Sequence, residues 1–178
     1  MQRKSFETAP CSIARSLDVI GDWWTPLLIR ECLYGVHRFD QFQRWLGIGR
    51  NILTRRLAQL VEQGVLERRA YQERPLRHEY HLTDKGYDAA RILLAMMSFG
   101  ERWAFTPEEA PIHLYSRDTD RRVHPMLVDR DTGQPLDARS LYAGPGPAFP
   151  QMPEIRRARF VEYYRRRADE RPAPTADS

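Results

Sequence analysis

The sequence predicts a mainly α chain with a small β component, an α+β fold class. Apolar residues recur at helical spacing from about residue 10 to residue 63, the spacing then changes to short strand-like runs, and a long helical pattern follows. The chain has 178 residues, of which 42% are hydrophobic. That length suits one domain with an appendage, and the composition allows a packed core.

Four short helices are predicted before residue 64, because apolar residues recur three or four positions apart and a glycine follows each run. In the last of them Leu53, Leu57 and Leu60 share one face. The predicted ranges are about 12–20, 24–34, 39–46 and 50–63.

Two strands and a long helix are predicted to follow. Residues 65–71 and 79–82 resemble strands, and residues 72–77 between them carry turn chemistry. Thr83 is a plausible N-cap for a helix that runs to about Trp103. Three helices, a strand, a basic loop, a strand and a helix form the order of a winged helix-turn-helix. In that fold one helix enters the major groove and the wing loop lies beside a phosphate chain.

The charge distribution indicates a nucleic-acid partner. The net charge is +4, and 26 of the 28 basic residues are arginine, whose planar fork binds phosphates and guanine edges, although a GC-rich genome would give the same bias. Residues 1–104 carry all of the net positive charge. Within them, residues 38–77 hold nine arginines against four acidic residues, which we interpret as the electrostatic footprint of DNA binding.

The predicted DNA contacts fall on one helix and one loop. The helix at 50–63 has polar residues opposite its leucine face, and arginine and asparagine can pair with base edges. The loop arginines flank Pro75 and are expected to hold the DNA backbone. The predicted base-reading residues are Arg50, Asn51, Thr54 and Arg55, and the other predicted DNA-binding residues are Arg38, Arg56, Arg74 and Arg77.

Several classes of protein are excluded by the sequence. No apolar run approaches the ~20 residues that cross a bilayer, and the first residues lack the apolar region of a secretory signal. Motifs of the H-E-x-x-H, G-x-S-x-G, P-loop and G-x-G-x-x-G kinds do not occur. We therefore expect a cytoplasmic protein without enzymatic activity, metal site, cofactor or membrane partner.

The chain resembles the HxlR family of bacterial transcriptional regulators, which are similar to the MarR-type repressors. The resemblance covers about residues 10–104 and depends on ordered matches at 11–21, 24–25, 35–39, 53–57, 64–66, 74–80 and 82–86. It implies a homodimeric DNA-binding regulator that dimerises through its first and last helices. A repressor that binds a pseudo-palindromic operator is the expected function, and the alternative is a winged helix that only binds proteins.

The last helix of this domain is apolar on more than one side, whereas a surface helix has a single apolar stripe. The excess apolar surface favours a dimer interface over cover by the C-terminal segment. The predicted interface residues are Ile13, Leu17, Leu93, Met96, Met97 and Trp103.

Cys11 is a candidate redox or electrophile sensor. It lies at the start of the first predicted helix, where unpaired N–H groups and the helix dipole favour a thiolate, and Arg15 adds positive charge. The resemblance also places it where some relatives sense electrophiles, so a small-molecule effector is a candidate partner. The alternative is a small buried residue, as we expect for Cys32.

The predicted domains are a DNA-binding and dimerisation domain at 10–104, a C-terminal extension at 105–170 and a disordered tail at 171–178. Proline density between Pro107 and Pro153 marks the change. Within the extension we expect a β-hairpin and then a basic amphipathic helix at 155–167. Its charges form either a solvated face or an additional phosphate contact.

Overall fold

The structure is a computed structural model, and it describes residues 5–106, 109–141 and 143–169. The chain divides into two compact units, one within residues 1–135 and the other within 136–178. The predicted extension at 105–170 is thus divided after its β-hairpin. The predicted tail at 171–178 lies outside the described residues. No described helix is long and apolar enough to cross a membrane.

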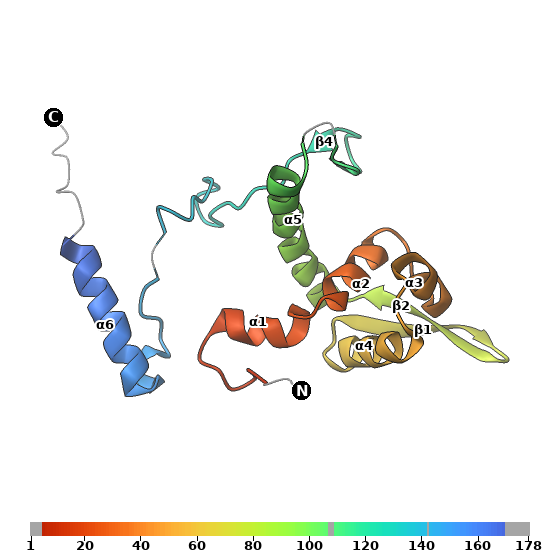
Figure 1. Ribbon diagram of the computed structural model, residues 1–178, viewed down its shortest axis with the longest axis horizontal. Helices are drawn as coiled ribbons and strands as arrows, with labels where there is room; N and C mark the ends of the chain where they lie inside the picture. The colour runs from red at the N-terminus through yellow and green to blue at the C-terminus, as the bar shows by residue number, and fades with distance from the viewer. Residues whose placement is uncertain (1–4, 107–108, 142, 170–178) are drawn as a thin grey trace. The chain divides into compact units, whose positions relative to one another are not determined.

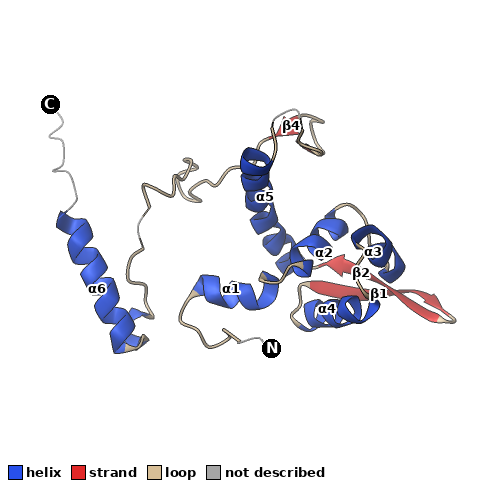
Figure 2. Ribbon diagram, viewed as in Figure 1, coloured by secondary structure: helices blue, strands red, loops and turns tan. Residues whose placement is uncertain are grey.

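The first unit is a winged helix-turn-helix, as the sequence predicts (Figure 1). Three helices pack around the base of a two-stranded antiparallel sheet, which is drawn in red in Figure 2. The elements in chain order are α1 (Ser12–Ile20), α2 (Trp24–Leu33), α3 (Phe39–Leu46), α4 (Arg50–Glu62), β1 (Leu66–Glu73), β2 (Leu76–Leu82) and α5 (Asp84–Ala104).

The core joins the helices to the base of the wing. Leu28, Ile29, Phe42 and Leu53 are fully buried in it. They belong to α2, α3 and α4, the three helices that carry the helix-turn-helix. Burying each such side chain contributes about 1.5–3 kcal/mol, so this cluster sets the angles between the helices. The remaining core residues are Cys32, Ile48, Leu57, Leu60, Val65, Leu66, Leu82 and Ala90.

The wing strands are longer than predicted. Pairing runs from Leu66 opposite Leu82 to Glu73 opposite Leu76, with an irregularity between Ala70 and Gln72. The predicted loop at 72–77 therefore belongs mostly to the strands, and the turn is at Arg74–Pro75. Both faces of the outer part of the wing meet solvent, so its residues do not alternate between apolar and polar. Without that alternation the sequence does not identify these residues as strand.

The start of α5 is attached to the wing base. Thr83 caps the helix as predicted: its hydroxyl accepts from the Gly86 backbone N–H at 3.2 Å and donates to the Gly64 carbonyl at 2.6 Å. Gly86, in the first turn of α5, is buried at this junction. A Cβ at this position would lie 2.4 Å from the Val65 carbonyl oxygen.

The predicted hairpin and basic helix are both present. The hairpin pairs β3 (Leu114–Tyr115) with β4 (Arg122–Val123), which are shorter strands than the sequence pattern indicated. In the second unit a short 3-10 helix, η1 (Phe149–Gln151), precedes α6 (Glu154–Asp169). The Phe149 and Phe160 rings pack edge to face with their centres 5.8 Å apart, and this contact holds η1 against α6.

We predict that Gly86→Ala destabilises the protein, because the added methyl group must displace the Val65 carbonyl or the Leu82 side chain. The expected loss in the free energy of unfolding is about 1–3 kcal/mol, measured by urea denaturation. Gly100→Ala is the matched control in the same helix, since nothing lies within 4 Å of its Cβ position. That change should stabilise the helix by about 0.5–1 kcal/mol. Equal effects of the two substitutions would contradict the prediction.

Candidate nucleic-acid interface

The α4 helix presents a polar face to solvent. Leu53, Leu57 and Leu60 are each at most 1% exposed, which fixes the rotation of the helix about its axis. The opposite face is exposed and carries Arg50, Asn51, Thr54 and Arg55. The Thr54 hydroxyl donates its proton to the Arg50 carbonyl at 2.9 Å. Toward solvent this hydroxyl can therefore only accept a hydrogen bond. The structure thus brings the four predicted base-reading residues together.

Arg56 is placed differently from the prediction. Its Nε lies 3.4 Å from Asp22 Oδ1, and the two side chains are 16% and 10% exposed. Its Nη1 also donates to Gln59 Oε1 at 3.0 Å. Asp22 in turn accepts from the backbone N–H groups of Trp24 and Thr25, at 2.9 and 3.1 Å, at the start of α2. Arg56 therefore joins α4 to the start of α2, and its guanidinium faces Asp22 and Gln59 instead of DNA.

Arg38 is fixed by the wing. Its Nε donates to Glu79 Oε1 at 2.9 Å, and its guanidinium lies 4.3 Å from the centre of the Tyr71 ring. The Arg38 side chain is still 45% exposed. The Arg38 guanidinium, which donates a hydrogen bond to Glu79, holds the pKa of that carboxyl below its usual range. Arg38 thus remains a candidate phosphate contact with a set orientation.

Other arginines lie exposed along the wing. Arg74 in the turn and Arg77 near the start of β2 are both exposed, as a contact with the DNA backbone requires. On β1, Arg69 forms an ion pair with Glu67. On α3, Arg44 is also exposed, and the prediction omitted it from the site. The sequence signal was available, because Arg44 lies within the arginine-rich stretch at 38–77.

The two cysteines have opposite environments. Cys11 is exposed and occupies the N-cap position of α1. Cys32 is buried, and burial raises the pKa of its thiol to about 12. Nucleophilic reactions require the thiolate, so Cys32 is the inert thiol of the pair, as predicted for a core residue.

The α5 helix has two apolar stripes, each with spacings of four, three and four residues. One stripe, consisting of Gly86, Ala90, Leu93 and Met97, faces its own unit: Gly86 and Ala90 are buried and Leu93 packs against the core. The other consists of Ile92, Met96, Phe99 and Trp103 and is 42–69% exposed.

This arrangement divides the predicted interface set. Met96 and Trp103 lie on the outer stripe of α5, and Ile13 and Leu17 of α1 are 74% and 44% exposed. Leu93 faces its own core instead. Met97 lines a pocket within the same unit. The exposed Ile92 and Phe99 belong to the candidate surface and were absent from the prediction.

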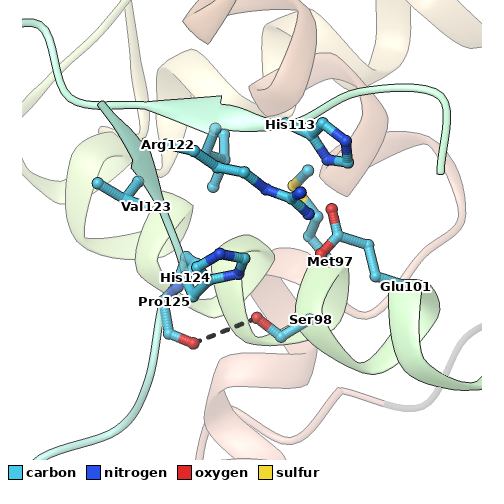
Figure 3. A pocket seen from close by; sticks show the side chains of 9 residues that line it. Met97, Ser98, Glu101, His113, Arg122, Val123, His124 and Pro125 are labelled. Atoms are coloured by element: carbon cyan, nitrogen blue, oxygen red, sulfur yellow. Dashed lines mark hydrogen bonds between the residues drawn. The ribbon is translucent and has the colours of Figure 1, made fainter. Parts of the chain in front are cut away.

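A small, shallow pocket that is open to solvent lies between α5 and the β3–β4 hairpin (Figure 3). Arg122 and His113 point toward Glu101 and Met97 of α5 in Figure 3. The Ser98 hydroxyl donates to the Leu94 carbonyl of its own helix at 3.1 Å and also lies 3.4 Å from the Pro125 carbonyl oxygen, just after β4. Among the described residues, no group forms a hydrogen bond with the buried Nδ1 of His113.

Comparisons with known proteins identify the family. The family model described as HxlR-like helix-turn-helix matches residues 19–108 of this chain. The chain belongs to the HxlR family. The uncharacterised HTH-type transcriptional regulator Rv3095 of Mycobacterium tuberculosis is 38% identical over 138 residues, which are 78% of this chain and 87% of the relative. The resemblance that the sequence carries at residues 10–104 is thereby confirmed.

Two solved structures agree with this assignment. PA1607, described as a candidate transcription factor, is 38% identical, with a TM-score of 0.71 over 80% of this chain and 100% of that one. PA1374 from Pseudomonas aeruginosa, described in the same way, is 40% identical, with a TM-score of 0.56 over 84% of this chain and 99% of that one. This HxlR-family chain is therefore a transcriptional regulator with a helix-turn-helix DNA-binding domain, and enzymatic activity is not a property of that class.

Proposed function

We propose that this HxlR-family chain is a cytoplasmic repressor that binds a pseudo-palindromic operator as a homodimer. The observation that carries the proposal is the position of α4, whose leucines are buried and whose arginine and asparagine side chains face outward. Arginine and asparagine are the residue types that bind guanine and adenine edges through two hydrogen bonds. In the proposed complex α4 occupies the major groove, and the wing arginines Arg74 and Arg77 contact the backbone.

The primary test is binding to random duplex DNA across a salt series. Each neutralised phosphate releases condensed counterions, so affinity must fall steeply as salt rises. A flat salt response, or no binding at low salt, would overturn the proposal. That outcome would favour the alternative in which the winged helix only binds other proteins.

We predict that Arg55 of α4 recognises bases, whereas Arg77 of the wing recognises the DNA backbone. Arg55→Ala should cost about 1–3 kcal/mol on operator DNA and relax specificity, since it removes a base contact. Arg77→Ala should weaken operator and random DNA alike and flatten the salt slope by ~1, since it removes a phosphate contact. Titrations of operator and random duplexes by fluorescence anisotropy measure both effects.

Arg56→Ala is the matched control for Arg55→Ala, because the two residues are adjacent on α4. It breaks the ion pair with Asp22, so we expect a loss of about 1–2 kcal/mol in unfolding free energy with the salt slope unchanged. Equal losses on operator and random DNA for Arg55→Ala would refute the base-reading role.

The exposed apolar residues of α1 and the outer stripe of α5 support the dimer. Phe99 and Trp103 are each 69% exposed, on a stripe of four large apolar residues. Contiguous apolar surface of this kind characterises protein interfaces, where aromatic residues dominate the binding energy.

We predict that Phe99→Asp weakens the dimer about 10–100-fold, because a carboxylate would be buried in an apolar interface without a partner. Sedimentation equilibrium measures the dissociation constant. Arg91→Gln changes the net charge by the same amount on the same helix, at a side chain that is 81% exposed, and should leave the dimer intact. A monomeric wild type, or equal effects of both variants, would contradict the prediction.

We also propose that Cys11 confers a response to electrophiles. Its exposed thiol lies at the N-cap of α1, one of the two helices of the proposed interface, so a bulky adduct would change how the two subunits pack. We predict that N-ethylmaleimide lowers the DNA affinity of the wild type but not that of Cys11→Ser. The buried Cys32 is present in both proteins and is the internal control. An identical response of both proteins, or of neither, would reject the role.

A further inference from the structure

Two histidines, a glutamate and an arginine form a continuous chain between α3 and the wing. The His37 and His81 rings stack with their centres 4.2 Å apart. His81 Nε2 lies 3.3 Å from Glu79 Oε2, and Arg38 Nε donates to the other carboxylate oxygen at 2.9 Å. Glu79 and His81 are two residues apart on β2, so their side chains share a face of the wing. His37 and Arg38 come directly before α3.

The acceptors around the two rings define where their protons lie. His37 Nδ1 is 3.1 Å from the Tyr80 carbonyl oxygen, which can only accept, so Nδ1 carries the proton. His81 Nε2 faces a carboxylate, which also only accepts, so this nitrogen carries the proton of the neutral ring. His81 Nδ1 and His37 Nε2 are therefore the atoms that take up a further proton. Because the stacked rings are so close, two positive charges on the pair repel each other, so the pair holds at most one further proton.

Arg38 is joined to the proposed groove helix through the next residue in the chain, Phe39. The guanidinium of Arg50, the first residue of α4, is 5.9 Å from the centre of the Phe39 ring, and Phe39 directly follows Arg38. Arg38 uses Nε on Glu79 and lies over Tyr71. Its terminal nitrogens are the donors left to face a phosphate, and arginine binds phosphate through such paired N–H groups.

Other charged and titratable groups face this cluster of four side chains from the neighbouring elements. Register places Glu67 opposite His81 and Arg69 opposite Glu79 on β1. With both histidines neutral, the ionised groups of the cluster carry one net negative charge, which opposes a phosphate; uptake of one proton removes it. The facing groups are Arg38 and Asp40 at the start of α3, Glu67, Arg69 and Tyr71 on β1, Glu79 on β2, and Cys32 of α2, whose thiol donates to the Tyr80 carbonyl.

We infer that Glu79 and His81 are positioning residues that hold Arg38 for a DNA phosphate, and that protonation of the His37–His81 pair strengthens this contact. The inference rests on the proposed DNA binding. A protonated His81 and Arg38 occupy different oxygens of Glu79, so they do not compete, and the carboxylate is held between two cations. The pair then carries a positive charge near the phosphate, and binding takes up a proton.

The sign of the pH dependence follows from that uptake. Phosphates favour the protonated pair, so the gain in affinity is complete below the pH at which the free protein titrates. It is lost as pH rises through the titration of the complex. Between pH 8 and pH 6 we expect affinity for random duplex DNA to rise about three- to tenfold per subunit.

The first experiment compares the pH profiles of full-length variants at constant ionic strength. The double variant His37→Gln, His81→Gln should lose the rise in affinity on acidification. His78→Gln is the matched control on the same strand, and it should keep the rise because residue 78 alternates to the other face. A pH profile that is unchanged in the double variant, or lost equally in His78→Gln, would overturn the inference.

The second experiment separates positioning from simple charge. If Glu79 only repels DNA, Glu79→Gln must tighten binding, because it removes a negative charge. If Glu79 positions Arg38, Glu79→Gln weakens binding several-fold, and Arg38→Ala then has little further effect in that background. Tighter binding, or full additivity of the two changes, would overturn the inference. A wild type that binds with a steep salt slope leaves the proposed function standing in either case, whereas a wild type that binds no DNA removes both.

Discussion

Burial of Leu53, Leu57 and Leu60 is the constraint on which the rest of the structure depends. Each of these side chains contributes about 1.5–3 kcal/mol when buried, so together they outweigh any single polar contact on the opposite face. Their burial determines how α4 is rotated, and the outward direction of Arg50, Asn51 and Arg55 follows from it. The candidate base-reading surface is thus a consequence of core packing rather than of interactions among the polar residues themselves.

The arginines of this domain have different roles because of the acids within their reach. Arg56 is largely buried against Asp22, and the pair joins α4 to the capped start of α2. Arg38 is half-exposed and oriented by Glu79. Arg74 and Arg77 extend from the wing turn into solvent. A single residue type therefore stabilises helix packing, forms an oriented contact between helix and wing, and provides the exposed charge of the proposed contact with the DNA backbone.

The α5 helix connects the DNA-binding unit to the proposed dimer. Its inner stripe packs on the core at Ala90 and Leu93, while its outer stripe, which includes Phe99 and Trp103, is exposed. In a dimer built on that outer stripe, the angle of α5 would set the distance between the two α4 helices. Half-sites one DNA turn apart require a fixed distance, so in that dimer the attachment of α5 at Thr83 and Gly86 would affect DNA binding.

Local chemistry in the sequence determined the elements and their order. Apolar spacing and glycine stops placed four helices, Thr83 capped the fifth, and the leucine face of α4 placed the polar residues opposite it. Only the tertiary structure decided that Arg56 faces Asp22, that Leu93 faces its own core, and that His37 stacks on His81. The physical reason is that periodicity records which side of an element is apolar, whereas an ion pair or a ring stack depends on which distant elements meet.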